Sequence, residues 1–396
     1  MPTRSKLTKA DITIIGAGVM GASIAWQLSK RTDKSILVLD QYTPLGGMSG
    51  RSFGQIRLHY SNALMLQMAM RGYDYFANWD KFVGYGDSGY LPMGYMLIVV
   101  EKQLEALNRN IELAQSLGIE TRFVDPKDIK AIEPCINTDG LVGGAWDPNG
   151  GFIDITRIVL AWLSASQEAG VKVATGVKVE GILTKGDTVT GLRTSAGEVE
   201  ASLVIDVTGS WGKELVKTLG IDVPVEPRRI DTMYLTQPPG GRQLGCCLTD
   251  GNSNIAIRPH MGREFLAGAY PPEMPVVSPI VDSDAENDQA HLRRIHKSLS
   301  ERLPDFVDAT PVRSVSGSYD VTPDWHPILG WVPGIDGLYL ATGFSGHGLK
   351  LAPSVGETVA DQVLGREPDF DISPLRLGRF ADNEPMFCAY GPGARA

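Results

Sequence analysis

The feature that most constrains this 396-residue chain is a glycine-rich segment directly after a short apolar run near the N-terminus. Residues 12–15 are consistent with a buried parallel strand, and residues 22–30 follow helical spacing. A second apolar run over residues 36–39 ends in an acid, Asp40. The glycines between the first strand and the helix are Gly16, Gly18 and Gly21. This order of strand, glycine loop, helix, strand and acid predicts a dinucleotide-binding α/β unit.

Each of these three positions has a physical requirement that glycine meets. Gly16 permits a tight turn, Gly18 lets the backbone approach a pyrophosphate, and Gly21 lets the helix pack closely on the strand. The helix N-terminus supplies unpaired N–H groups and the positive end of the helix dipole. Asp40 lies 19 residues after Gly21, where a carboxylate can accept hydrogen bonds from the adenosine ribose and disfavours the 2′-phosphate of NADP. The motif alone does not choose between FAD and NAD.

Charge and hydropathy exclude several kinds of partner. The formal net charge is −9, from 37 basic and 46 acidic residues, whereas nucleic-acid binding normally needs a basic excess. The longest stretches without charge are about 13 residues, and a membrane-spanning helix needs roughly 20. The basic N-terminal segment lacks a small-residue cleavage site, so no secretory signal is predicted. We therefore expect a soluble, cytoplasmic protein with no nucleic-acid partner and no membrane span.

The cysteines and histidines do not follow the spacing of a metal site. Cys135, Cys246, Cys247 and Cys388 form no C-x-x-C pair, and the six histidines are scattered. We expect reduced, structural thiols and no metal.

Elements of the nucleotide-binding type recur along the chain, with different material between them. An apolar strand over residues 204–207 runs into a glycine before a helix. A last strand over residues 337–343 leads through a glycine-rich turn into a final helix that reaches about residue 364. The intervening residues 221–315 are proline-rich and mixed. This interleaving predicts two domains that share the chain discontinuously. The tail after Asp371 is expected to be loosely structured.

Seven segments match, in order, the motifs of a known family. They are the glycine motif with its acid at 16–40, GRSFGQIR at 50–57, GFID at 151–154, VKV at 177–179, TGSW at 208–211, TPDWHPILG at 322–330 and GFSGHGLK at 343–350. Together they resemble the D-amino-acid oxidase superfamily of FAD-dependent oxidoreductases, and within it the sarcosine oxidase/glycine oxidase-like branch. The resemblance extends from residue 11 to residue 364, and the last two motifs are the most specific.

The resemblance implies an α/β (α+β) architecture. A Rossmann-like FAD-binding domain of the glutathione-reductase type is interleaved with a substrate domain built on a mixed β-sheet. We expect the FAD-binding domain over residues 1–88, 150–221 and 316–380, and the substrate-binding domain over residues 89–149 and 222–315. Residues 381–396 are assigned to a C-terminal tail.

The resemblance also implies which residues contact FAD. Val179 would contact adenine through its backbone, residues 51–56 would run past the pyrophosphate and the flavin, and residues 346–350 would point N–H groups at the flavin N1–C2=O edge. The full expected set is Gly16, Gly18, Val19, Met20, Gly21, Asp40, Gln41, Gly50, Arg51, Ser52, Phe53, Gly54, Gln55, Ile56, Val179, Thr208, Gly209, Trp211, Gly343, Ser345, Gly346, His347, Gly348, Leu349 and Lys350.

The residues of the last motif support this role on physical grounds. A glycine turn that opens a helix provides free N–H groups and the positive dipole end, which together make an anion site. Reduced flavin carries negative charge near N1, so such a site would stabilise it. Pro353 falls early in this helix, where it removes an N–H and is expected to cause a kink.

Family members oxidise a carbon next to an amine by hydride transfer to flavin N5, and the imine that forms is hydrolysed. Their substrates are usually small amino acids or N-methyl and other secondary amino acids. The carboxylate of such a substrate needs a fixed cationic partner, and the matching positions here are Arg57 and Lys350. Arg57 offers a planar fork for a carboxylate, and Lys350 lies in the first turn after the flavin loop.

Several other residues are expected near the substrate. His59, Tyr60, Tyr319 and His347 are candidates for shaping the pocket, of which Tyr60 and His347 join the two cations in the catalytic set. None is assigned as a base, because the amine can bind unprotonated. Arg228 and Arg229 lie near the expected domain crossover, where flavin contact and a surface role are equally open.

Two departures from relatives bear on the chemistry. The cysteine that tethers FAD in monomeric sarcosine oxidases is replaced here by Gly317, and the histidine of dimethylglycine-type dehydrogenases corresponds approximately to Arg51. We therefore expect noncovalent FAD. The stretch that carries an oxygen-activating lysine in sarcosine oxidases matches residues 254–270, where the only cations are Arg258, His260 and Arg263. Oxidase and dehydrogenase activity both remain open.

Two alternatives also remain open. The chain could be an FAD-dependent 2-hydroxy-acid oxidoreductase, because related folds oxidise C–OH bonds. It could also be a flavoprotein subunit of a larger dehydrogenase complex, with an electron-acceptor or subunit partner.

Overall fold

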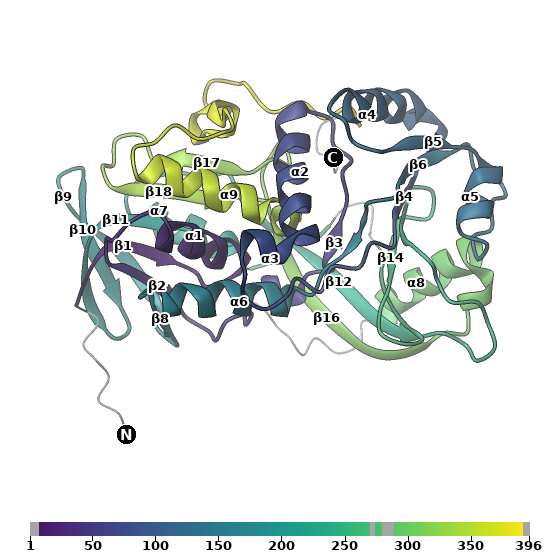
Figure 1. Ribbon diagram of the computed structural model, residues 1–396, viewed down its shortest axis with the longest axis horizontal. Coiled ribbons are helices and arrows are strands. Elements are labelled where there is room, and N and C mark those ends of the chain that lie inside the picture. The colour runs from purple at the N-terminus through teal and green to yellow at the C-terminus, as the bar shows by residue number, and fades with distance from the viewer. Residues whose placement is uncertain (1–7, 270–273, 279–288, 391–396) are drawn as a thin grey trace.

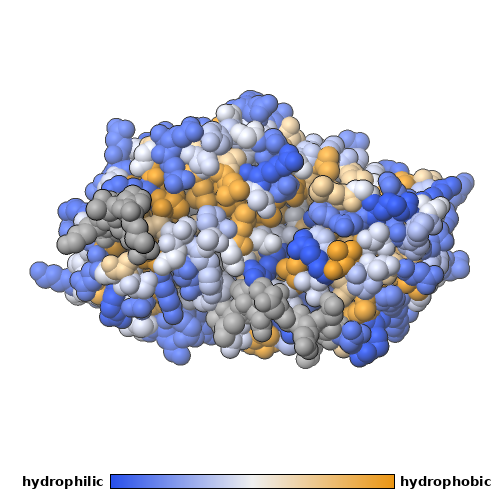
Figure 2. Space-filling model, turned by 90° about the horizontal axis from the view of Figure 1, so that it is seen from below, coloured by the Kyte–Doolittle hydropathy of each residue, from blue (hydrophilic) through white to orange (hydrophobic). Residues whose placement is uncertain are grey.

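The computed structural model describes residues 8–269, 274–278 and 289–390. Within these residues the strands form two eight-stranded sheets and one two-stranded ribbon. Figure 1 shows an elongated molecule in which the two large sheets lie side by side, each with its own helices. Each sheet has its own hydrophobic core. The face in Figure 2 is largely hydrophilic, with a band of apolar residues on one half of the molecule and smaller apolar patches on the other.

Sheet one has the strand order β17-β18-β11-β1-β2-β8, with a β9–β10 hairpin attached to β11. Its central pairs β1–β2, β1–β11, β11–β18 and β2–β8 are all parallel. The bounds are β1 Lys9–Ile15, β2 Ile36–Asp40, β8 Lys172–Thr175, β9 Val179–Lys185, β10 Thr188–Thr194, β11 Gly197–Asp206, β17 Ile328–Trp331 and β18 Leu338–Thr342. Such strands are buried on both faces and therefore read as continuous apolar runs.

The two faces of sheet one are covered by different layers. Ile12 and Ile14 of β1 pack into the core beneath the long helices, while Ile15 packs into the core on the opposite face. The helices of the first layer are α1 Val19–Ser29, α2 Ala63–Ala77, α6 Ile155–Glu168 and α9 Gly348–Val363. The short α3 Trp79–Phe82 follows α2, and α7 Gly212–Lys217 follows β11. Pro353 lies inside α9, which continues to Val363.

Sheet two is mixed and has the order β16-β12-β15-β14-β13-β4-β6-β5. Only its β4–β13 pair is parallel among the described pairs. The bounds are β4 Tyr95–Ile98, β5 Arg122–Val124, β6 Gly144–Asp147, β12 Glu226–Thr236, β13 Cys247–Asp250, β14 Ile255–Pro259, β15 Glu264–Ala269 and β16 Thr310–Val321. Its helices are α4 Leu104–Ser116, α5 Pro126–Ile132 and α8 Gln289–Arg302.

Two elements join the halves. The long antiparallel ribbon of β12 and β16 pairs from Glu226–Val321 to Thr236–Thr310. The ribbon of β3 Gln55–Ile56 and β7 Gly151–Phe152 connects the second glycine-rich loop, residues 45–54, to the start of α6. The boundary expected at residue 316 falls inside β16, which is one continuous strand. We propose the same division into two domains, with the β12–β16 ribbon as the element they share.

The chain after Asp371 is more ordered than its composition indicates. It forms two 3₁₀ turns, Ser373–Leu375 and Leu377–Phe380. Arg379 is fully buried and bonds both carboxylate oxygens of Asp324 at 2.8 and 2.9 Å. The loosely structured tail expected from the sequence is therefore wrong for residues 373–380, where Arg379 pairs with a residue 55 positions earlier. Residues 384–388 have no regular secondary structure.

In the described residues no helix is long and apolar enough to cross a membrane, and no group of three or more His, Cys, Asp or Glu side chains could hold a metal ion.

Candidate cofactor and substrate site

A single cavity of about 1750 Å³ runs along the carboxyl ends of the sheet-one strands and continues into sheet two. Crevices at the carboxyl ends of parallel strands are the usual ligand sites of α/β sheets. The cavity wall combines segments from the start, middle and end of the chain, including residues 45–57, 177–180, 207–215, 317–323 and 344–350. The sequence motifs, although far apart along the chain, therefore lie together on the wall of this cavity.

The first glycine loop is held in shape by Asp40. Gly16 has φ +115°, a conformation that favours glycine, and a Cβ there would lie 2.9 Å from the carbonyl oxygen of Val207. The N–H of Ala17 donates to Asp40 Oδ2 at 2.7 Å, and the N–H of Tyr42 donates to Asp40 Oδ1 at 2.8 Å. Burial raises the pKa of Asp40, and these two hydrogen bonds oppose the shift. Asp40 also lines the cavity.

The second glycine-rich loop, residues 45–54, folds over the start of α1. Ser49 Oγ accepts a hydrogen bond from the N–H of Val19 at 3.0 Å. Arg51 Nη1 donates to the carbonyl oxygens of Gly46 and Gly47, both at 2.8 Å. From sheet two, Arg258 donates from Nε to the carbonyl oxygen of Phe53. The loop is therefore fastened from both halves of the molecule.

The cations of the 254–270 stretch do not line the cavity in the described part of the chain. The Arg258 guanidinium lies 4.3 Å from the centre of the Phe152 ring, behind the loop. His260 contacts the Tyr234 ring edge-on at 5.3 Å, and Arg263 donates to the carbonyl of Pro238. This stretch instead presents Asn254, Ile255 and Ala256 to the cavity.

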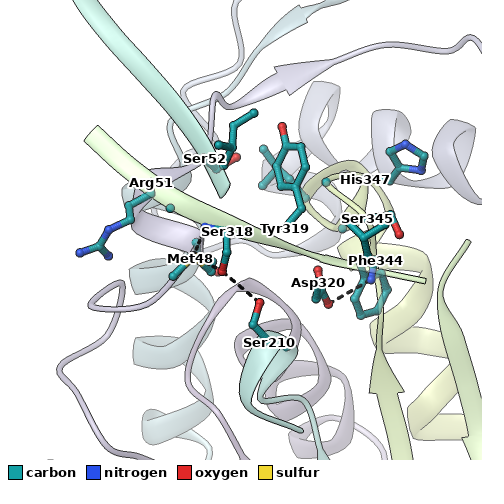
Figure 3. Close-up of a pocket in the computed structure, with 18 of the residues that line it drawn as sticks. Met48, Arg51, Ser52, Ser210, Ser318, Tyr319, Asp320, Phe344, Ser345 and His347 are labelled. Carbon is teal, nitrogen blue, oxygen red and sulfur yellow. Dashed lines mark hydrogen bonds between the residues drawn. The ribbon is translucent and has the colours of Figure 1, made fainter. Parts of the chain in front are cut away.

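The last motif is fixed by a residue that the sequence did not single out. Asp320 Oδ2 accepts hydrogen bonds from the N–H groups of Gly343 at 2.8 Å and Phe344 at 3.0 Å (Figure 3). The carbonyl of Asp320 accepts a further bond from the N–H of Ser345 at 3.1 Å. Burial raises the pKa of Asp320 to about 6, against the opposing effect of these bonds. Asp320 is the only acid of β16 and lies near the end of that strand, which was the available signal.

The turn that follows leads directly into α9. Gly346 has φ +82°, and a Cβ there would lie 2.7 Å from Cζ of the Tyr319 ring, so only glycine allows this close approach. Figure 3 shows Tyr319, Ser345 and His347 around this turn. No side chain caps the N-terminus of α9 at His347. The first turn of α9 therefore presents backbone N–H groups beside the cavity.

The four catalytic candidates gather around one ring. The Arg57 guanidinium carbon lies 4.7 Å from the centre of the Tyr60 ring, and Lys350 Nζ lies 5.9 Å from it. The His347 ring meets the Tyr60 ring edge-on at 5.5 Å. Arg57, His347 and Lys350 line the cavity, whereas Tyr60 is fully buried behind them. Burial raises the pKa of Tyr60 to about 12.

The surroundings of Lys350 destabilise the charged form of its side chain. It is 6% exposed, and burial followed by the positive charge of Arg57 holds its pKa well below the ordinary value. Two cations that face the same cavity repel each other unless an anion lies between them. The pair therefore forms a site that an anionic ligand would stabilise.

Asp147 positions the segment that carries Arg57 and was also missed by sequence reasoning. Asp147 is buried, and its Oδ2 accepts a hydrogen bond from the N–H of Leu58 at 2.8 Å. Burial raises the pKa of Asp147 to about 6. Arg57 itself donates to the carbonyl of His59. These bonds join β6 to residues 57–59, a connection across 89 residues that no local pattern reveals.

The other residues that the sequence placed near the substrate or the flavin differ in their surroundings. Tyr319 and Arg228 line the cavity, and Arg228 also pairs with Glu226 at 2.8 Å. Arg229 pairs with Asp231 at 3.0 Å. His59 is 2% exposed, and burial followed by the charge of Arg57 lowers its pKa to about 3, so its ring is neutral.

Most residues expected to contact the cofactor line the cavity. They are Gly16, Gly18, Val19, Met20, Asp40, Gln41, Arg51, Ser52, Phe53, Gly54, Gln55, Val179, Thr208, Gly209, Trp211, Ser345, Gly346, His347, Gly348, Leu349 and Lys350. The four that do not are Gly21, Gly50, Ile56 and Gly343. A Cβ on three of them would overlap the carbonyl of Gly16, the carbonyl of Leu45 or the methyl of Thr322, and Ile56 is a core side chain.

A comparison of the whole chain with protein families decides its membership. A family model described as FAD dependent oxidoreductase, abbreviated DAO, matches residues 11–362. The chain belongs to the DAO family of FAD-dependent oxidoreductases. The expected family and the expected α/β fold are thereby confirmed.

Relatives of this DAO-family enzyme span nearly its full length. It is 27% identical over 421 residues to FAD-dependent oxidoreductase domain-containing protein 1 of Xenopus laevis, covering 96% of this chain and 84% of that one. It is 29% identical over 390 residues to peroxisomal sarcosine oxidase of Homo sapiens, covering 93% and 96%. The crystal structure of L-proline dehydrogenase from P. horikoshii superposes with a TM-score of 0.87 at 22% identity, covering 96% and 100%.

Family membership implies FAD, and the cavity fits such a group. Its wall contains the glycine turn at Gly16 and the uncapped start of α9, which both offer backbone N–H groups to an anion. One buried side-chain nitrogen, Arg51 Nε, has no hydrogen-bond partner within the described residues and belongs to a residue that lines the cavity. Buried donors of this kind normally have a partner, which a bound ligand can provide.

Proposed function

We propose that this DAO-family enzyme oxidises the C–N bond of a small amino acid or an N-methyl or other secondary amino acid. Its substrate is held by the carboxylate between Arg57 and Lys350. The single observation that carries this proposal is the pair of cations, one of them buried, that face one cavity over the ring of Tyr60. A carboxylate between them would relieve their repulsion and form charge-assisted hydrogen bonds.

We infer that FAD is bound noncovalently along this cavity wall. The Gly16–Val19 turn would hold the pyrophosphate, Asp40 the ribose, and residues 346–350 the pyrimidine edge of the flavin. When bound, FAD supplies the oxidising chemistry, accepting two electrons and a proton from the carbon next to nitrogen so that an imine remains for hydrolysis. Gly317 and Arg51 offer no nucleophile for a covalent link.

The protein's own contribution is orientation and charge. Arg57 is fixed through the Asp147–Leu58 bond and its own bond to the His59 carbonyl, so its fork is preorganised for a carboxylate. The carboxylate would restore the charged form of Lys350, because an anion opposes the desolvation that lowers its pKa. Water enters only after oxidation, to hydrolyse the imine.

No group is proposed as a base. His59 is neutral with a pKa of about 3 and hydrogen-bonded to another side chain, and the pKa of Tyr60 is raised to about 12. The substrate amine is therefore expected to bind unprotonated beside His347.

An anaerobic screen of flavin reduction tests the proposal. N-methyl amino acids, cyclic imino acids and primary amino acids are added to the purified protein under argon, with the corresponding 2-hydroxy acids as the matched comparison. Bleaching by amines with a free carboxylate, and not by the hydroxy acids, is the expected result. Bleaching only by hydroxy acids would identify a 2-hydroxy-acid oxidoreductase. No bleaching, together with a co-purifying protein, would indicate a subunit of a larger dehydrogenase complex.

A further inference from the structure

The C-terminal segment Glu384–Tyr390 lies beside the cavity. In Figure 1 the yellow chain leaves the layer of α9 and crosses over α2 towards α4. The segment is anchored at its start, where the N–H of Met386 donates to Asp324 Oδ2 at 2.9 Å, the same carboxylate that the buried Arg379 holds. It ends against residues 59–61, which follow Arg57.

Tyr390 is fixed at that end by a buried polar network. Its hydroxyl lies 2.6 Å from Nε2 of His59, and the two rings stack at 6.0 Å. Nδ2 of Asn110 on α4 lies 3.4 Å from the same Nε2 and donates to Ser61 Oγ at 3.2 Å. The Tyr390 hydroxyl, the His59 ring and the Asn110 amide therefore form one buried polar network.

The Tyr390 ring belongs to the cavity wall, although it comes from the opposite end of the chain to its neighbours. It lines the cavity together with Arg57, and it packs against the cluster that contains Val99. Tyr95 also lines this cavity. The hydroxyl contact of Tyr390 and its stacking with the His59 ring restrict the rotation of the Tyr390 side chain.

The other side chains of this compartment are mainly apolar. Leu97 and Val99 come from β4 and the turn after it, and Ile255 and Ala256 come from β14. Gln103, Thr249 and Asn254 are the uncharged polar residues of this part of the wall, and the one acid, Asp250, pairs with Arg302 at 2.7 Å. An apolar compartment next to a carboxylate clamp suits the hydrocarbon side chain of an acid better than a charged one.

We propose that Tyr390 is a specificity-determining residue of this enzyme. Its ring closes the apolar compartment beside Arg57, so it limits how long an apolar side chain the bound acid can carry, and His59 is the positioning residue that holds the ring. This inference rests on the proposed function, because it assumes that the carboxylate of the ligand lies between Arg57 and Lys350.

The test measures ligand binding without turnover, through the change that a bound acid causes in the flavin absorption spectrum of the purified holoenzyme. The ligands are the straight-chain acids acetate, butyrate, hexanoate and octanoate, which carry no amine to be oxidised. The proteins are the wild type, Tyr390→Ala, Tyr390→Phe and Tyr390→Trp. The control is Tyr85→Ala, which removes an exposed tyrosine outside the cavity wall.

The expected result is a shift in the preferred chain length. In Tyr390→Ala the ratio of octanoate to butyrate affinity rises about tenfold over wild type, roughly what two further buried methylenes contribute. Tyr390→Trp shifts the preference towards shorter acids. Tyr390→Phe keeps the ring but loses the hydroxyl contact with His59, so it should change the ratio in the same direction as Tyr390→Ala and by less. Tyr85→Ala leaves the ratio unchanged. Tyr390→Trp also tests the idea should Tyr390→Ala fail to fold.

Two failures are distinguishable. If the acids bind but neither Tyr390→Ala nor Tyr390→Trp alters the chain-length preference, Tyr390 does not set specificity and the carboxylate clamp stands. If no acid perturbs the wild-type spectrum at any concentration, the clamp itself is wrong, and the proposed function and this inference are overturned together.

Discussion

Asp320 and Phe344 are joined by a buried hydrogen bond of 3.0 Å, from the backbone N–H of Phe344 to Oδ2 of the carboxylate. The same oxygen accepts the N–H of Gly343. A carboxylate at the end of β16 thereby fixes the turn that opens α9, the element whose first N–H groups are proposed to face the flavin. The position of the cofactor loop depends on a side chain outside the loop.

Removing this carboxylate is expected to weaken FAD binding. In Asp320→Ala two backbone N–H groups lose their acceptor, so the dissociation constant for FAD should rise about tenfold. Asp320→Asn keeps one acceptor oxygen and should lie between the two. Equilibrium dialysis of apoprotein with FAD measures the constants. Wild-type FAD affinity in Asp320→Ala would show that the turn holds its shape without this acid.

The raised pKa of Asp320 predicts a specific pH dependence of stability. Its pKa is about 6 in the folded chain and ordinarily near 3.8, so between these values the folded state binds more protons than the unfolded state. The unfolding free energy contributed by this group therefore falls as pH rises from about 4 to 6, by about 1–3 kcal/mol. Urea titrations at several pH values should show this slope in the wild type and its reduction in Asp320→Asn. Identical slopes in both proteins would contradict the assignment.

Arg57→Met is expected to weaken carboxylate binding and leave the flavin content unchanged. Loss of a charge-assisted pair should raise the dissociation constant for a carboxylate ligand about 100-fold. Arg57→Lys retains the charge without the planar fork, so it should recover only part of the affinity. Spectral titration of the flavin gives both constants. Unchanged affinity in Arg57→Met would remove Arg57 from the site.

Lys350 should make carboxylate binding depend on pH. Its pKa in the free enzyme is held well below the ordinary value, and only its protonated form attracts the anion. Affinity for a carboxylate should therefore decrease as pH rises through that lowered pKa. The dependence should disappear in Lys350→Met, which has no proton to lose. Titrations at several pH values in both proteins make the comparison, and a dependence that persists in the variant must come from another group.

The ion pair of Arg379 and Asp324 should be a major support of the fold. Both side chains are almost fully buried, so Arg379→Met leaves an unpaired carboxylate in the interior and should lower the unfolding free energy by about 3–5 kcal/mol. Arg376→Met is the matched control. Its partners Asp382 and Glu384 are exposed, so it should cost at most about 1 kcal/mol. Equal losses in the two variants would show that burial of the pair has no such effect.

Sequence alone predicted the elements that depend on local pattern. The strand, glycine loop, helix and acid at residues 12–40 appear as β1, α1 and β2, because hydrophobic periodicity and glycine geometry are local properties.

The residues that organise the site from a distance could not be predicted in this way. Asp147 bonds Leu58 across 89 residues, and Tyr390 bonds His59 across 331. Such pairs follow from the packing of the two sheets and from no spacing along the chain. Gly50 and Gly343 were expected at the cofactor, but they instead allow close contacts with Leu45 and Thr322. A short motif does not separate contact with a ligand from contact with the protein.

In the proposed function, Arg57 and Lys350 together bind the carboxylate of the substrate. The most direct test compares an N-methyl amino acid that reduces the flavin with its own primary amide, which keeps the amine and the reacting carbon but carries no negative charge. Anaerobic stopped-flow absorbance gives the apparent second-order rate constant of flavin reduction for each. The account predicts a decrease of about 100-fold or more for the amide, equal to the loss of about 2.7 kcal/mol of binding. Equal rate constants for the acid and its amide would contradict it.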